Sequence, residues 1–490
     1  MMSIGQELDP EFTTTIDERL PFKSKIAFGL AQASNGILSG IALGAAITFF
    51  YNVKLGLSEE LISLAWLLFA FWNAINDPLF GILQERIDTT MGRRIPVLRF
   101  GAPIYTLVFI ICWFPFMGNT QIALFWNLLL VLFLIDSMFT LIGLVLFSLP
   151  AEMCLTQEGR SNLGLYNVVL GASGGILSAI LPLILLTDET STQLNPLYKP
   201  VMILVGIVAG TVLMLSSYSL TENEYARWEE PLDFRSSIVE TVKNREFLAF
   251  EASNFSRELA FTIIMGSITY FVQYVLKLHG FMASLPLIII FGILILCSFL
   301  AYKMVKQRGL KQVYIIGLLL AGIGLVLLFF SGSWIFLVMI SLTVLGIGVA
   351  PVLLINPPLM ADVIDYDEML TGKRRETTYA GMNALITKPA ISISNALFLL
   401  IINAFGFDNT KNAQLDSAIF GIQLGYTLVP AIFFLLSALT LLKWYKLDGE
   451  EWIAKKAKLS KIHLKKEREY IERLQREGKI SKVYQKLYKG

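Results

Sequence analysis

Long apolar runs alternate with short charged or polar stretches along the chain. A helix rises about 1.5 Å per residue, so about 20 apolar residues are enough to cross a hydrocarbon core of about 30 Å. The pattern therefore predicts twelve membrane-spanning helices, over residues 26–53, 58–84, 95–117, 121–150, 161–187, 199–220, 256–278, 281–303, 311–331, 333–359, 377–406 and 416–444.

A polar stretch between the sixth and seventh predicted helices divides these runs into two equal sets. The expected organisation is a cytoplasmic N-terminal segment (1–25), a six-helix bundle (26–220), a cytoplasmic connector (221–255), a second six-helix bundle (256–445) and a basic cytoplasmic tail (446–490). This layout resembles the major facilitator architecture, whose halves are related by an axis along the membrane normal. We expect an all-α membrane protein of that fold.

Composition and charge support a multi-pass protein. Hydrophobic residues make up 55% of the chain and charged residues 16%, which excludes a water-soluble protein. The net charge of +2 gives no basic field for nucleic acid. Most Lys and Arg residues lie in the termini and inner loops, which places both termini in the cytoplasm. The chain begins with acidic residues instead of a signal peptide, and a prokaryotic plasma membrane is the expected location.

Chemistry of other kinds finds no support in the sequence. The three cysteines lie in or beside apolar segments without CxxC spacing, so neither a disulfide framework nor a metal site is expected. No set of nucleophile, base and orienting group is visible, so we expect no catalytic residues and no enzyme activity. The basic tail is interpreted either as a solvated cytoplasmic helix or as a segment that binds anionic lipid. A monomer in the lipid bilayer is expected.

The second predicted helix carries polar side chains at its inner end. Asn73, Asn76 and Asp77 share one helix face through their i, i+3 and i+4 spacing. A carboxylate inside a span costs at least about 2.5 to 3.5 kcal/mol, so it normally faces a cavity and a partner. Lys388 is the lysine well inside a span and is the expected partner. Such oxygen ligands suit Na⁺ or proton exchange, and the alternative is an inert ion pair that fixes helix packing.

Two charged clusters lie at inner helix ends and are interpreted as a cytoplasmic gate that exchanges salt bridges as the bundles rock. Simple topogenic charge and a static latch are the alternatives. The gate residues are Glu85, Arg86, Arg93, Arg94, Asp362, Asp365, Asp367, Arg374 and Arg375.

The first predicted helix has small and polar residues on the same segment. Gly36, Gly40 and Gly44 recur at four-residue spacing, which favours close helix packing over a ligand cavity. Gln32 and Asn35 on this helix supply hydrogen-bonding groups for a cavity near the bilayer midplane.

Two long signatures resemble those of the glycoside-pentoside-hexuronide cation symporters, the family that includes melibiose permease. One is NDPxxG (76–81) followed by GRR (92–94), and the other is ADVIDYDExxTGxRRE (361–376) followed by Lys388. The resemblance extends to an EFL segment (246–248) and a YxLDGE segment (445–450), and so covers essentially the whole chain.

The resemblance implies a cation site and a sugar site. The cation site falls on Asn73, Asn76, Asp77, Thr140 and Lys388. Sodium-using members have an aspartate where this chain has Asn73. With Asp77 and Lys388 as the only charges, the empty site would be neutral, which favours proton exchange or uniport over Na⁺ binding.

The sugar site matches less well. The corresponding positions lie near Asn35, Gly143, Phe147 and Asn167 and include no acid and no arginine. Galactoside recognition in the family's known manner is therefore unsupported, and a less polar ligand would suit this cavity.

The sequence thus predicts a secondary transporter without a cofactor, which moves a sugar or glycoside by alternating access with H⁺ or Na⁺ as the coupling ion at Asp77. A carrier of lysolipids or other amphiphiles and a non-transporting membrane receptor are the alternative functions.

Overall fold

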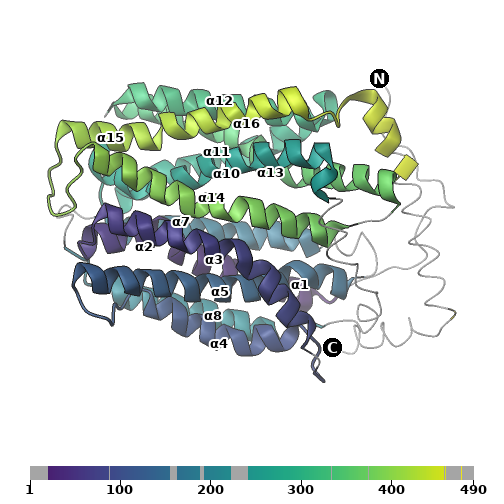
Figure 1. Cartoon of the computed structure of the whole chain (residues 1–490), viewed down its shortest axis with the longest axis horizontal. Helices are drawn as coiled ribbons and strands as arrows, with labels where there is room; N and C mark the ends of the chain where they lie inside the picture. Colours follow the sequence, from purple (N-terminus) through teal and green to yellow (C-terminus); the bar gives the residue numbers. More distant parts are fainter. Residues whose placement is uncertain are drawn as a thin grey trace.

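The computed structural model describes residues 20–87, 89–154, 163–187, 193–221, 241–332, 334–372, 375–456, 458–459 and 476. The helices lie side by side in two layers, one from each half of the chain (Figure 1). The N-terminal half contains α1 (Phe22–Ala42), α2 (Ala45–Phe49), η2 (Phe50–Lys54), α3 (Glu59–Glu85), α4 (Ile95–Ile111), α5 (Gln121–Met153), η3 (Asn167–Gly171), α7 (Ala172–Leu186) and α8 (Tyr198–Ser216). The C-terminal half contains α10 (Arg245–Tyr270), η5 (Phe271–Val275), α11 (Phe281–Arg308), α12 (Leu310–Ser331), α13 (Ile335–Thr371), α14 (Glu376–Ala404), α15 (Asp416–Tyr426) and α16 (Leu428–Trp444).

Each of the twelve predicted ranges contains a helix of the structure. Ten helices in the described ranges are long and apolar enough to cross a membrane, and α4 is a shorter apolar helix. The helix α3 is long enough but less apolar, because Asn73, Asn76 and Asp77 interrupt its hydrophobic sequence. The number of membrane crossings stays a prediction.

Two helices extend beyond their predicted spans. The helix α10 begins at Arg245, where the Asn244 side chain accepts hydrogen bonds from the first backbone amides. The helix α13 continues to Thr371 and ends at Gly372, whose left-handed backbone suits a glycine terminator. The acidic residues predicted in a loop, Asp362, Asp365 and Asp367, therefore lie on the last turns of a helix.

The glycines of α1 pack closely against α7. A side chain at Gly40 would approach the Ser178 hydroxyl to 2.3 Å, and one at Gly174 would approach the Ala33 carbonyl oxygen to 2.4 Å. Small residues therefore allow the two backbones to lie against each other, as the four-residue spacing predicted.

Polar contacts join the two halves at the end that contains η2 and α15, here called the closed end. Tyr270 donates to Asn52 Oδ1 over 2.9 Å, and Asn403 Nδ2 donates to Glu60 Oε1 over 2.9 Å. The backbone amide of Gly280 donates to the Thr187 carbonyl over 2.9 Å. Because these contacts link both halves, the described conformation is sealed at this end.

Candidate functional site

Lys388 of α14 reaches from the C-terminal half into a polar cluster of the N-terminal half. Its ammonium forms an ion pair with Asp77 of α3. It also donates to Thr140 Oγ1 of α5 over 2.9 Å and to Asn76 Oδ1 over 3.2 Å. Both partners of the ion pair are 14% exposed at the side chain. The structure therefore confirms the predicted partner of Asp77 and shows that the pair is not fully buried.

Asn73 takes a different place from its neighbours. Its side-chain amide donates to the backbone carbonyl of Lys388 over 3.1 Å. The contact holds α14 against α3 beside the ion pair, so Asn73 positions the Lys388 backbone in the described state. All five residues expected in the cation site are thus brought together.

Asp136 of α5 is a second carboxylate in this cluster, and the sequence interpretation missed it. It is 2% exposed and accepts a hydrogen bond from Asn76 Nδ2, which also donates to Thr140 Oγ1 over 3.0 Å. The expectation that Asp77 and Lys388 are the only charges is therefore wrong. When both carboxyl groups are ionised, two negative charges face one ammonium group.

This charge balance changes what the cluster can bind. A buried charge without a counter-charge is costly in a low-dielectric interior. A monovalent cation or a proton would remove the excess charge, and the carboxylate, hydroxyl and amide oxygens present are hard ligands that suit Na⁺. The neutrality that was expected to disfavour Na⁺ therefore does not hold when Asp77 and Asp136 are both ionised.

The residues expected to bind substrate in the N-terminal half are only partly brought together. Gln32 of α1 donates to the Leu146 carbonyl of α5 over 3.5 Å. Asn35 is 6% exposed, and its Oδ1 atom has no hydrogen-bond partner in the described part of the chain. Phe147 is 64% exposed, and Asn167 lies on the π-helical turn η3 of the fifth segment. Their role in binding stays a prediction.

The described gate residues of the C-terminal half include members of two ion pairs. Arg375 makes a bidentate pair with Asp367, with N–O distances of 2.6 to 3.0 Å, and both side chains are buried. Arg94, in the other half, donates to Gln84 Oε1 over 2.9 Å. Arg86 is exposed and Arg93 is half-buried. The expected role of these residues as a gate stays a prediction, and Arg374 and the Glu85 side chain lie outside the described residues.

The start of the C-terminal tail packs on the C-terminal end of α13. Asp362, expected in the gate, pairs with Lys456 and accepts from the Trp452 indole N–H over 3.0 Å. The Trp452 ring packs edge-on against Tyr366. This part of the tail is therefore docked on the protein, an arrangement that neither interpretation of the tail included.

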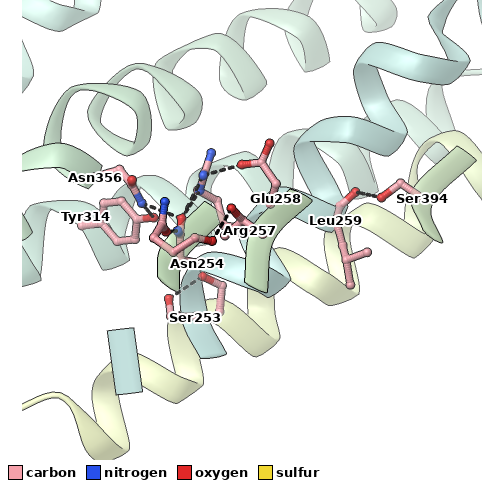
Figure 2. A network of polar contacts seen from close by, with 11 residues as sticks. Ser253, Asn254, Arg257, Glu258, Leu259, Tyr314, Asn356 and Ser394 are labelled. Carbon is pink, nitrogen blue, oxygen red and sulfur yellow. Dashed lines mark hydrogen bonds and ion pairs between the residues drawn. The ribbon is translucent and has the colours of Figure 1, made fainter. Parts of the chain in front are cut away.

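A second polar network lies in the C-terminal half, around Asn254 of α10 (Figure 2). Asn254 Oδ1 accepts from Asn356 Nδ2 of α13 over 2.9 Å, and from Arg257 over 2.8 and 3.1 Å. Arg257 also forms an ion pair with Glu258 over 2.5 Å. The predicted seventh span began at residue 256, which placed these charges at its edge. Because α10 begins at Arg245, they lie in the interior of the helix.

A small cavity lies between α10, α11 and α13, toward the closed end from this network. Its volume is about 20 Å³, and its lining is apolar, including Phe261, Phe291 and Val349. A cavity of this size holds about one water molecule. It is therefore too small to hold a sugar.

The chain is similar to known transport proteins over most of its length. Residues 27–449 match the family described as MFS/sugar transport protein. The chain is 22% identical to the isoprimeverose transporter of Lactiplantibacillus pentosus over 440 residues, which cover 88% of this chain and 90% of the relative. It is 24% identical to the inner membrane symporter YicJ of Escherichia coli (strain K12) over 440 residues, which cover 88% of this chain and 93% of the relative.

A solved structure with a similar fold is the D-xylose–proton symporter. The two structures superpose with a TM-score of 0.62 at 14% sequence identity, covering 87% of this chain and 98% of the other. The two-layer arrangement of helices is therefore that of the major facilitator fold.

Proposed function

The chain belongs to the MFS/sugar transport protein family, whose members are membrane transporters and not enzymes, and we propose that it carries a sugar or glycoside by alternating access, coupled to Na⁺ or H⁺ at the cluster around Asp77. Coupling to a cation is inferred from one observation. Two carboxyl groups, those of Asp77 and Asp136, lie in the cluster with the ammonium group of Lys388. A cation that binds the two carboxylates competes with the lysine for Asp77. Its arrival would release the contact between α3 and α14.

The contact that such a cation would replace lies between the two halves of the molecule. Lys388 belongs to α14, whereas Asp77, Asn76 and Thr140 belong to the N-terminal half. When the halves separate on this side, the pair must break, and a bound cation would keep the carboxylates neutralised. This exchange of counter-charges is how the site couples cation binding to the movement of the halves.

The driving force available is sufficient for accumulation. One positive charge that moves through 100 mV contributes about 2.3 kcal/mol, and a tenfold ion gradient adds about 1.4 kcal/mol. Symport of one cation per substrate would therefore support a substrate ratio of roughly 500.

The sugar class of substrate rests on the relatives, which include an isoprimeverose transporter and a glucuronide carrier protein homolog. The test is uptake of labelled isoprimeverose, D-xylose and a methyl glucuronide into proteoliposomes, under an imposed Na⁺ or proton gradient. Uptake stimulated by Na⁺ at fixed pH identifies Na⁺ as the coupling ion, and uptake that follows only the pH gradient identifies H⁺. If no gradient drives any of these sugars uphill, the proposal fails.

The variant Asp77→Asn tests the assignment of the site. We expect it to abolish uphill accumulation and to retain part of the downhill exchange, because the substrate pathway stays open while the coupling charge is lost. Asp408→Asn is the matched control, since Asp408 pairs with Lys411 in an exposed loop at the closed end. Accumulation by Asp77→Asn equal to that of the parent protein would contradict the assignment.

A further inference from the structure

Resting on the transport function proposed above, we propose that Arg257 and Glu258 of α10, with Asn356 and Asn383, form a binding site in the C-terminal half for the hydroxyl groups of a polyhydroxylated substrate. A charged pair inside a membrane helix is costly to insert and marks a functional site by default. The side chains of Arg257 and Glu258 are 10% and 22% exposed. The pair is therefore not fully buried.

The hydrogen bonds of the network leave a specific set of groups free. Arg257 uses Nε and Nη2 for its bonds to Asn254 and Glu258, which leaves both N–H groups of Nη1 available among the described contacts. Glu258 uses Oε2 for its one contact among the described residues. Its other oxygen and the two N–H groups therefore offer an acceptor beside donors, which suits neighbouring hydroxyl groups of a sugar.

The two amides add further groups of both kinds. Asn356 donates from Nδ2 to Asn254 and to the Tyr314 hydroxyl, so its Oδ1 remains an open acceptor in the described contacts. Asn383 of α14 accepts from Asn254 at Oδ1 over 2.7 Å, which leaves its own amide N–H groups as donors. Asn254 bonds to three neighbours, Asn356, Arg257 and Asn383, and so holds the free groups in place.

The free groups lie on one side of α10. Figure 2 shows Asn356, Arg257 and Glu258 on the same side of the helix, whereas Ser253 lies on the other side. Ser253 there bonds to Ser437 of α16 over 2.7 Å. The face of α10 that carries Ser253 is therefore packed against α16, and Arg257 and Glu258 lie away from that contact.

A buried acid lies beside this network. Glu251, one turn before Asn254, is 2% exposed, and neither carboxylate oxygen has a hydrogen-bond partner in the described ranges. An acid this deeply buried is costly for a purely structural network and marks a functional region of the helix.

The position of the network relative to Lys388 links substrate binding to the cation site. The helices α10 and α14 are joined by the bond from Asn254 to Asn383 and by the bond from Ser394 to the Leu259 carbonyl over 3.1 Å. On α10, Arg257 lies between Asn254 and Leu259, and on α14, Lys388 lies between Asn383 and Ser394. Both cations therefore lie in the segment where the two helices are in contact, and Asn383 is little more than one helical turn from Lys388.

The first experiment measures access to the pair and needs no known substrate. Glu258→Cys is made in a Cys297→Ser background, where the remaining Cys112 and Cys154 are buried. A charged, water-soluble methanethiosulfonate reagent should modify this thiol. The control is Leu296→Cys on α11, which is 70% exposed among apolar residues and should face lipid. If Glu258→Cys is as unreactive as the control, the proposal is overturned.

The second experiment measures binding by thermal shift with isoprimeverose, D-xylose, a methyl glucuronide and lysophosphatidylcholine as probes. A sugar should stabilise the parent protein and slow the modification of Glu258→Cys. Arg257→Gln, Glu258→Gln and the double variant should weaken that binding at least about tenfold, because each leaves bound hydroxyl groups without partners. The double variant Asp408→Asn with Lys411→Gln removes an exposed ion pair and should leave the affinity unchanged.

The outcomes separate this inference from the proposed function. The double variant at 257 and 258 keeps the network neutral, so its unfolding temperature without ligand shows whether it is folded. If it is folded and binds the sugar as the parent does, the inference fails and the transport function stands. If the parent binds and transports none of the sugars, and only lysophosphatidylcholine protects Glu258→Cys, the sugar function and the inferred ligand class both fail.

Discussion

The two polar clusters of the molecule differ in how they pair their charges. In the cluster of the N-terminal half, the only ammonium group among the described members, that of Lys388, comes from the other half of the chain. In the cluster of the C-terminal half, Arg257 and Glu258 are neighbours on one helix. Movement of the halves must break the first pair and leaves the second intact. The first arrangement suits a switch, and the second suits a binding surface that travels with its half.

The largest expected effect is the removal of the charge that links the halves. Lys388→Met leaves Asp77 and Asp136 without a counter-charge, which we expect to lower the free energy of unfolding by about 3 kcal/mol and to abolish uphill transport. The double variant Asp77→Asn with Lys388→Met should recover most of the stability but none of the coupling. Thermal unfolding and uptake in proteoliposomes measure both. A single variant as stable as the parent would show that the pair is not the link described here.

Asp136→Asn is expected to have a smaller effect, confined to coupling. The amide can still accept from Asn76, so the packing of α3 against α5 is preserved while one negative charge is lost. The site would then be neutral with Lys388 in place, and we expect cation affinity to fall at least about tenfold. The cation concentration that gives half-maximal uptake measures this change.

The exposed Asp416 provides the control for that variant, because Asp416→Asn removes the same charge from the first turn of α15. An unchanged cation dependence in Asp136→Asn would show that Asp77 alone determines the charge of the site. The first cluster would then have no excess negative charge to distinguish it from the second.

The sequence predicted the helices and the central ion pair because both follow from the cost of polar groups in lipid. A lone lysine and a lone acid inside spans must find partners, and Asp77 and Lys388 do. The same rule would have found Asp136, which stands alone in the long apolar run of α5, one turn before Thr140. The signal was present in the sequence and was not used.

Other features could not be predicted from the sequence, for physical reasons. The depth of Arg257 depends on where α10 begins, and this start is determined by the Asn244 cap and not by hydropathy. The docking of Trp452 on α13 depends on tertiary contacts with Asp362 and Tyr366. The contacts between the halves at the closed end belong to the described conformation, and the alternating access proposed here requires a second one with the same sequence.

The smallest expected effect comes from the loss of one hydrogen bond between the halves at the closed end. Tyr270 lies on α10, the helix of the second cluster, and its hydroxyl bonds to Asn52 of the other half. Tyr270→Phe removes this one bond, which contributes about 1 kcal/mol. The population that is open at this end should therefore rise roughly fivefold, while the free energy of unfolding should change little.

Distances between spin labels at Met117 and Lys411, which are exposed in loops of the two halves at the closed end, measure that population. Tyr426→Phe is the matched control, because the Tyr426 hydroxyl is buried within the C-terminal half and has no partner among the described residues.

Opening in Tyr270→Phe should leave sugar binding at Arg257 and Glu258 unchanged, since the pair moves with α10. If opening instead changed the affinity of that site, the second cluster would depend on both halves, as the first does, and the distinction between switch and binding surface would fall.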